Sequence, residues 1–224
     1  MEEKKKRELA RWCDRRLQKE YGDRTPEETP DPLDMLILTV LSQNTNDVNR
    51  DRAYEALRTG FPRWEDVMEA RPAEIEELIR VGGLAGQKSV RIKAMLEQIK
   101  EREGKLDLER VCKMPVESAL EYLYSFQGVG EKTAAIVLLF SCGKPIFPVD
   151  THIHRMSRRL GLVPEKKSAA EAHRIMGELV EPKAYYRLHL NLIDHGRRIC
   201  RARKPLCEEC CLNSKCPSAY RIEK

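Results

Sequence analysis

Residues 123–135 read LYSFQGVGEKTAA, and this stretch carries the strongest local signal in the chain. A helical pattern of apolar residues ends near Phe126, two glycines flank Val129, and a second helical pattern begins at about Glu131. Glycine permits a tight turn between helices because it has no Cβ atom to restrict the backbone. The stretch therefore predicts two helices joined by a short turn, the pattern of a helix-hairpin-helix.

This turn has a chemical use as well as a structural one. The glycines let a phosphate approach the backbone closely, and the amides at the start of the second helix point outward to receive an anion. Such contacts hold a DNA backbone without reading its sequence. An ordinary turn between packed helices is the alternative, and a glycine pair alone does not exclude it.

The rest of the chain also has helical periodicity, with apolar residues three and four positions apart and no sustained strand-like alternation. Glycine and proline residues separate the helical segments. The sequence therefore predicts an all-α fold. The expected helices cover residues 4–20, 32–43, 46–59, 72–80, 86–102, 116–125, 131–141, 150–160, 168–180 and 184–199.

The composition is typical of a folded protein with a charged surface, since 34% of the 224 residues are charged and 6% are aromatic. The longest apolar run, residues 35–41, is too short to cross a bilayer. The N-terminus has no apolar segment of the kind found in secretory signals. We therefore expect a cytoplasmic protein without a membrane partner.

The net charge of +5 is compatible with a polyanionic partner but does not require one. Basic residues concentrate in the last third of the chain, where they could form either solvated helix faces or a surface for nucleic acid. They are Arg155, Arg158, Arg159, Lys166, Lys167 and the basic residues from Arg197 through Lys204.

The eight cysteines fall into two groups. Cys13, Cys112 and Cys142 are isolated in helix-like segments and are interpreted as small buried hydrophobic residues. Four of the other five have the spacing C-x6-C-x2-C-x5-C, which in a reducing cytosol indicates a metal site rather than disulfides. Four thiolates suit zinc and an iron–sulfur cluster equally. The predicted ligands are Cys200, Cys207, Cys210 and Cys216; Cys211 is interpreted as a bystander that could compete with Cys210.

Two further segments accompany the hairpin and the cysteines. Residues 147–155 read FPVDTHIHR, and residues 41–47 read LSQNTND. With these marks in order, the chain resembles the endonuclease III group of helix-hairpin-helix DNA glycosylases. That group shares a GVG hairpin followed by lysine, a VDTHI segment and the same cysteine spacing. The resemblance extends over nearly the whole chain.

The resemblance implies a two-domain molecule. A six-helix barrel would cover residues 25–144, with the helix-hairpin-helix at about 116–141. Residues 1–24 and 145–224 would form a second helical domain, in which the four cysteines hold a [4Fe–4S] cluster. DNA would bind in the groove between the domains. We expect a monomer that acts on double-stranded DNA containing a damaged or mispaired base, at the nucleoid of the cytoplasm.

The resemblance also assigns DNA contacts. Leu84 would wedge into the base stack and Gln43 or Asn44 would probe the opened space, because a stacked base must leave the duplex before its glycosidic bond can be reached. Taken alone, a leucine is more often a core residue, but glycines beside Leu84 favour an exposed tip. The expected DNA contacts are Gln43, Asn44, Leu84, Gly128, Val129, Gly130, Thr133, His152, Arg201, Arg203 and Lys204.

The expected catalytic pair is Lys132 and Asp150. An amine such as that of Lys132 can displace the base at C1′ of the sugar and form a Schiff base, which then permits β-elimination of the 3′ phosphate. A carboxylate such as that of Asp150 can stabilise the cationic sugar and assist proton transfer. The alternatives are an exposed surface lysine and a helix N-cap aspartate, and the second role is compatible with catalysis.

Three departures from the family pattern concern substrate choice. Gln127 stands where proline is usual, Glu131 stands where a basic residue is usual, and residues 43–45 differ from the usual segment. We expect a glycosylase and abasic-site lyase for oxidised or damaged pyrimidines. The alternatives are a mismatch-specific uracil or thymine glycosylase, whose members typically lack the lysine, and a non-catalytic DNA-binding module with a zinc loop.

Overall fold

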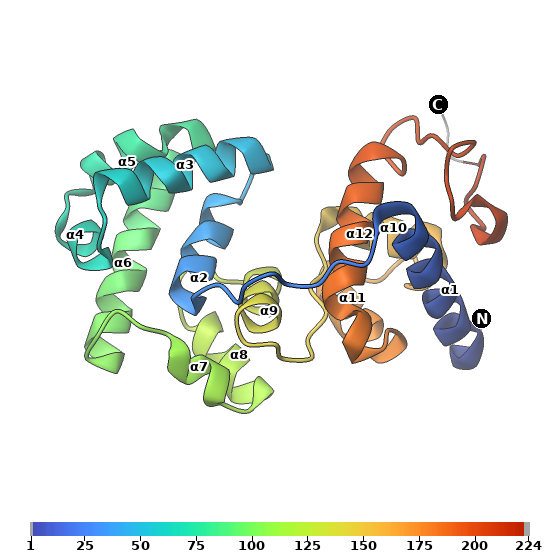
Figure 1. Ribbon diagram of the computed structural model, residues 1–224, viewed down its shortest axis with the longest axis horizontal. Helices are drawn as coiled ribbons and strands as arrows, with labels where there is room; N and C mark the ends of the chain where they lie inside the picture. Colours follow the sequence, from blue (N-terminus) through green and yellow to red (C-terminus); the bar gives the residue numbers. More distant parts are fainter. Residues whose placement is uncertain (1, 222–224) are drawn as a thin grey trace. The chain divides into compact units, whose positions relative to one another are not determined.

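The computed structural model describes residues 2–221, and every regular element in this range is helical (Figure 1). The all-α prediction is confirmed, and each predicted helix is present with its ends shifted by at most two residues. No helix in this range is long and apolar enough to span a membrane. The predicted helices are α1 (Glu3–Tyr21), α2 (Pro32–Leu41), α3 (Asp47–Gly60), α5 (Pro72–Ile79), α6 (Ala85–Glu103), α8 (Val116–Tyr124), α9 (Glu131–Phe140), α10 (Thr151–Arg159), α11 (Ala169–Leu179) and α12 (Tyr185–Arg198).

The sequence did not predict the short elements. They are too short to show two turns of helical periodicity, so the pattern of apolar residues does not reveal them. At the start of α4 the Asp66 carboxylate accepts from the Arg63 amide at 3.2 Å. These elements are α4 (Trp64–Glu69), α7 (Glu109–Lys113) and the 3-10 turns η1 (Arg80–Gly82), η2 (Pro182–Ala184) and η3 (Asn213–Lys215).

The chain divides into two compact units. Residues 29–144 form the first, which we call the hairpin unit, and residues 1–28 with 145–224 form the second, which we call the cysteine unit. Residues 1 and 222–224, which the predicted cluster domain includes, lie outside the described residues.

The core of the hairpin unit centres on α2 and α9, which pack against each other. Both helices are apolar on most sides, and such helices are stable only when they are surrounded by other elements. In α2 seven of ten residues are buried, and in α9 the buried residues include Ala134, Val137 and Leu138. α8 also packs on α9, so the second helix of the hairpin is held from two sides. This packing fixes the turn that precedes it.

In the cysteine unit, α12 packs against both α1 and α10, so the N-terminal helix joins the C-terminal helices. Polar contacts reinforce this association. Arg187 of α12 donates to both Asp14, through Nη2 at 2.7 Å, and Asp23, through Nη1 at 2.8 Å. Arg24 and Asp194 form a further ion pair. The unit is therefore assembled from segments that are distant in the sequence.

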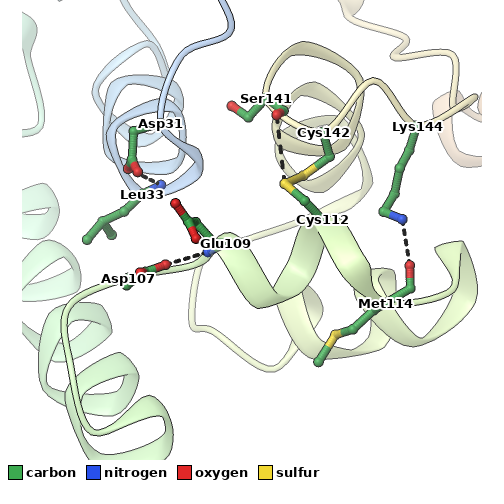
Figure 2. Close-up of a disulfide and its surroundings, with 9 residues drawn as sticks. All are labelled: Asp31, Leu33, Asp107, Glu109, Cys112, Met114, Ser141, Cys142 and Lys144. Atoms are coloured by element: carbon green, nitrogen blue, oxygen red, sulfur yellow. Dashed lines mark hydrogen bonds between the residues drawn. A yellow bond between two sulfur atoms is a disulfide. The ribbon is translucent and has the colours of Figure 1, made fainter.

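The interpretation of Cys112 and Cys142 as buried free cysteines is wrong, because they form a disulfide (Figure 2). The two residues are 30 positions apart and both are partly exposed. Cys112 lies in α7 and Cys142 lies just beyond α9, and the fold brings their Cα atoms within 4.8 Å. The bond therefore encloses α8, the hairpin turn and α9 in one covalent loop. Cys13 is buried and free, as predicted.

Candidate active site and cysteine loop

The hairpin turn between α8 and α9 has the geometry that its glycines predict. Gly128 has a φ of +85°, in the left-handed region that favours glycine, and the Val129 amide donates to Phe126 O at 3.1 Å. Gly130 is the N-cap of α9 and offers no side chain to the amides of the first turn. A Cβ atom at Gly130 would meet nothing within 4 Å. The start of α9 is therefore uncapped and open to an anion.

Two other turns of the hairpin unit lie beside this one. Gln43 donates from Nε2 to Gly128 O at 3.1 Å, which ties the turn after α2 to the hairpin. A Cβ atom at Gly83 would lie 3.9 Å from Asn44 O, so the turn before α6 contacts the same segment. Leu84, in that turn, is 46% exposed and is not a core leucine. The structure thus brings Gln43, Asn44 and Leu84 together with the hairpin.

Two of the predicted DNA contacts have buried side chains. Val129 is 6% exposed and Thr133 is 4% exposed. Contacts from these two residues to DNA can come only from their backbone atoms. This is compatible with a phosphate-binding turn, in which the backbone rather than the side chains does the binding.

Lys132 is the second residue of α9, and its side chain is partly buried. The next three residues of the helix are buried in the core, so the lysine is held on a rigid element. The first turn of a helix carries the positive end of the helix dipole, so Lys132 lies where anions are favoured. Glu131, the neighbouring acid, is exposed.

Asp150 is the N-cap of α10, and its Oδ1 accepts from the Ile153 amide at 2.8 Å. The N-cap interpretation is confirmed, and this bond fixes the orientation of the carboxylate. Two histidines anchor the chain just before it: His189 Nδ1 donates to Pro148 O at 3.0 Å, and the Val149 amide donates to His173 Nδ1 at 3.2 Å. Neither histidine could be predicted from the motif, because they come from α11 and α12, well away from the VDTHI segment.

His152 is partly buried beside arginines. Burial lowers its pKa, and the positive charges of Arg155 and Arg197 act in the same direction, whereas Asp150 raises it. Arg155 Nη2 lies 3.2 Å from His152 Nδ1. The lowered pKa favours a neutral imidazole, so His152 is better suited to hydrogen bonding than to charge pairing with a phosphate.

Two of the basic residues noted in the last third of the chain, Arg155 and Arg159, are hydrogen-bonded to the segment that carries the four cysteines, residues 200–216, which we call the cysteine loop. Arg155 donates to Cys200 O through Nε at 3.0 Å and to Gly196 O through Nη2 at 2.8 Å. Arg159 donates to Arg201 O at 2.7 Å and to the Cys200 sulfur at 3.3 Å. These two arginines therefore hold the loop in place. Arg201, Arg203 and Lys204 of the same loop are exposed.

The four predicted ligand cysteines, Cys200, Cys207, Cys210 and Cys216, line one small cavity, whereas Cys211 is not among its lining residues. His195 adds an imidazole nitrogen 3.2 Å from the Cys210 sulfur. Burial raises the pKa of the Cys210 thiol to about 12. A bound metal would have to displace this proton, since thiolates are the ligands.

The donor set is compatible with a [4Fe–4S] cluster. The four thiols line one cavity, and two N–H donors lie beside their sulfurs, at Arg159 and His195. Four thiolates are the usual protein ligands of such a cluster, and zinc accepts the same set.

Comparison with known proteins identifies the family to which the chain belongs. Residues 37–182 match the family described as HhH-GPD superfamily base excision DNA repair protein. An endonuclease III of Thermotoga maritima is 35% identical over 93% of this chain and 91% of its own length. A putative DNA glycosylase of Arabidopsis thaliana is 35% identical over 91% of this chain, which spans 66% of that protein.

Solved structures give the same result. An endonuclease III in a non-covalent complex with DNA has a TM-score of 0.83 and 25% identity, covering 96% of this chain and 97% of its own. A trapped endonuclease III–DNA covalent intermediate has a TM-score of 0.82, 25% identity and the same coverage. A thermostable thymine-DNA glycosylase, 22% identical over 98% of this chain and 99% of its own, has a TM-score of 0.80 and shares the fold.

Proposed function

Since the chain belongs to the endonuclease III family of the HhH-GPD superfamily, and is thus a base-excision DNA glycosylase and abasic-site lyase, we propose that Lys132 and Asp150 are its catalytic residues. The observation that carries the proposal is the position of Lys132 in the first turn of α9, directly after the uncapped hairpin. A phosphate bound at the hairpin would bring the neighbouring nucleotide within reach of this amine.

The covalent step begins when the Lys132 amine attacks C1′ of an extruded nucleotide. A bond forms between Nζ and C1′, the glycosidic bond breaks, and the base leaves with the electron pair and takes up a proton. The C1′–O4′ bond then breaks, O4′ takes up a proton and Nζ gives one up, so that the Nζ–C1′ bond becomes a Schiff base; loss of a C2′ proton then expels the 3′ phosphate by β-elimination. Hydrolysis of the Schiff base releases Lys132.

Asp150 would support these reaction steps from a fixed position. Its carboxylate would stabilise the positive charge that develops on the sugar and would assist proton transfer during the reaction. The hydrogen bond from the Ile153 amide fixes one oxygen of the Asp150 carboxylate, so this carboxylate is already ordered before the reaction begins.

We propose oxidised or otherwise damaged pyrimidines as the substrates. The resemblance to the endonuclease III group implies this class, and the lysine at the hairpin supports a covalent route rather than simple hydrolysis. Bases are read after extrusion, which costs least when the base is damaged or mispaired. A panel of duplexes, each with one lesion, tests this choice, and uracil and thymine opposite guanine test the mismatch alternative.

Borohydride trapping on DNA with a preformed abasic site tests the lyase mechanism. The proposal expects a covalent adduct with the wild-type chain and none with Lys132→Ala. Lys144→Ala, a lysine in the same unit whose Nζ donates to Met114 O, serves as the control and should still be trapped. An adduct that survives Lys132→Ala would place the nucleophile elsewhere.

We further propose that Cys200, Cys207, Cys210 and Cys216 hold a [4Fe–4S] cluster, which would shape the loop that carries Arg201, Arg203 and Lys204. The shared cavity of the four thiols supports this assignment. Purified protein is expected to be brown and to absorb broadly near ~400 nm, as iron–sulfur centres do. A colourless sample that contains zinc would contradict the assignment.

The domain organisation, the partner, the oligomeric state and the location are proposals as well. We propose that the hairpin unit is the six-helix barrel domain and that the cysteine unit is the cluster domain. Double-stranded DNA with a damaged or mispaired base is the partner, and the active form is a monomer at the nucleoid of the cytoplasm. The proposed DNA contacts include the turns that carry Gln43, Asn44 and Leu84.

A further inference from the structure

Lys88 lies in the first turns of α6, and only 1% of it is exposed. Its Nζ donates to two backbone carbonyls, Leu41 O and Gly82 O, each at 2.8 Å. These acceptors end α2 and η1, and the last carbonyls of a helix have no partner within the helix. A buried amine is unfavourable unless it is hydrogen-bonded, so these two bonds account for its burial.

Both carbonyls lead directly into the turns that the proposed function assigns to DNA. Leu41 O precedes the Gln43–Asn44 turn, and Gly82 O precedes Leu84. The backbone amide of Lys88 also donates to Leu84 O at 3.0 Å. One residue is therefore bonded to the base of both turns.

Both turns contain a residue with a left-handed backbone. Asn44 has a φ of 53° and Leu84 has a φ of 52°. Asparagine tolerates this region, whereas it is unfavourable for leucine. Such conformations persist only where the surrounding structure holds them in place. The side chain of Leu84 is 46% exposed, so the hydrogen bonds of the backbone around it contribute to holding this turn.

We propose that Lys88 is a positioning residue for base extrusion, which holds Leu84 and the Gln43–Asn44 turn at a fixed separation so that both enter the duplex together. The inference rests on the proposed roles of these turns. Burial lowers the pKa of Lys88 to about 8. A neutral amine still has two N–H donors, so both carbonyls can be bonded on either side of that pH.

The same helix offers a matched control. Lys93 also donates from Nζ to two backbone carbonyls, Met68 O and Ala70 O, where α4 ends and α5 has not yet begun. Lys88→Met and Lys93→Met therefore remove the same kind of support from the same unit. Of the two lysines, Lys88 is the one bonded to the base of the Gln43–Asn44 turn and of the turn that carries Leu84.

The experiment uses the full chain and a duplex with a tetrahydrofuran abasic analogue opposite 2-aminopurine. The fluorescence rise at saturating protein reports how far the orphaned base is unstacked, and it requires no base release. At saturation the rise is a property of the bound complex, so a lower folded fraction does not reduce it. Base release from damaged pyrimidines is measured separately on the wild-type chain, so a failure of the proposed substrate is recognised independently.

We expect the wild-type chain and Lys93→Met to give the full rise and Lys88→Met to give less than half of it. If Lys88→Met does not fold, Lys88→Gln replaces it, because its amide can donate to one of the two carbonyls and should give an intermediate rise. A full rise with the Lys88 variant, an equal loss with Lys93→Met, or no rise with the wild-type chain would each overturn the proposal.

Discussion

Helices α9 and α10, one in each unit, begin with almost the same backbone conformation. The N-cap of α9, Gly130, has φ −104° and ψ −176°, and that of α10, Asp150, has φ −97° and ψ −176°. At α9 no side chain caps the amides, whereas at α10 the Asp150 carboxylate already occupies that place. One helix start is open to a phosphate and the other carries its own anion.

This contrast assigns different tasks to two similar helix ends. The open end can bind a DNA phosphate and orient the lysine beside it. The closed end does not bind a second anion. It holds a carboxylate in a fixed place, where the carboxylate can stabilise a positive charge that develops on the substrate. The helix dipole favours both arrangements, since both place negative charge at an N-terminus.

The largest effect is expected from Asp150→Asn. Asparagine caps a helix about as well as aspartate, so α10 should remain intact while the negative charge is lost. Base release should slow by about 10² to 10⁴-fold, the range for acid–base groups, with DNA affinity largely unchanged. Single-turnover base release and fluorescence anisotropy measure the two quantities.

Asp150→Ala is the companion variant, because it removes the cap as well as the charge. It should lose a further ~1 kcal/mol of stability relative to the asparagine variant. If Asp150→Asn weakened DNA binding as much as it slowed base release, the role of Asp150 would be structural.

The second prediction concerns the far ends of the two helices. Beyond α9 the chain is held by the Cys112–Cys142 disulfide, whereas α10 is held by bonds from Arg155 and Arg159 to loop carbonyls. A disulfide that closes a loop of this length stabilises the folded state relative to the unfolded state by about 3 kcal/mol. Reduction, or a Cys112→Ala/Cys142→Ala double variant, should therefore lower the melting temperature. The double variant is the control, since a reductant should not shift its melting curve further; a wild-type chain that melts alike with and without reductant would contradict the prediction.

The third prediction concerns a variant in which the N-terminus of α9 carries a capping carboxylate, as the N-terminus of α10 does. Gly130→Asp gives α9 the cap that α10 has, and the position has room for the side chain and an extended backbone. Stability should rise by about 0.5 kcal/mol, while DNA affinity should fall about tenfold because the carboxylate takes the place of the phosphate. Gly130→Ala, without charge, should change affinity much less. The loss with Gly130→Asp should shrink as salt rises, and an affinity equal to that of the alanine variant would show that no phosphate binds here.

The difference between the two helix starts was partly visible in the sequence. Gly130 and Asp150 stand next to clear helical patterns, so both N-caps could be predicted from local residues. The helices and the four-cysteine loop followed from local spacing in the same way. Catalytic roles for Lys132 and Asp150 came from the family resemblance and not from their local pattern.

Contacts between distant segments could not be predicted. The Cys112–Cys142 disulfide, the bonds of Lys88 and the bond from Gln43 to Gly128 each join residues that the sequence separates. Lys88 in particular looks like one more polar residue of an amphipathic helix, because periodicity does not tell which lysine is buried. The partners of Arg155 and Arg159 were hidden for the same reason, since their charge left a solvated helix face and a DNA surface equally open, whereas both donate to backbone carbonyls near the cysteines.

The smallest effect is expected from Arg91→Ala. Arg91 of α6 packs on the hairpin turn, with its Nε 3.3 Å from the place where a Cβ atom at Gly128 would lie. It is partly exposed, and no carboxylate pairs with it among residues 2–221. Its positive charge therefore stands beside the open start of α9, whereas Arg155 and Arg159 are already bonded to the cysteine loop.

Removing this charge should weaken binding to damaged and undamaged duplexes alike, by about threefold at moderate salt, because phosphate contacts do not read sequence. The slope of log affinity against log salt should fall by about one. Lys100→Ala, which removes an exposed charge near the other end of α6, should leave that slope unchanged. Equal slopes for the wild-type chain and Arg91→Ala would mean that the guanidinium only packs on Gly128, and that the backbone amides of α9 bind the phosphate without it.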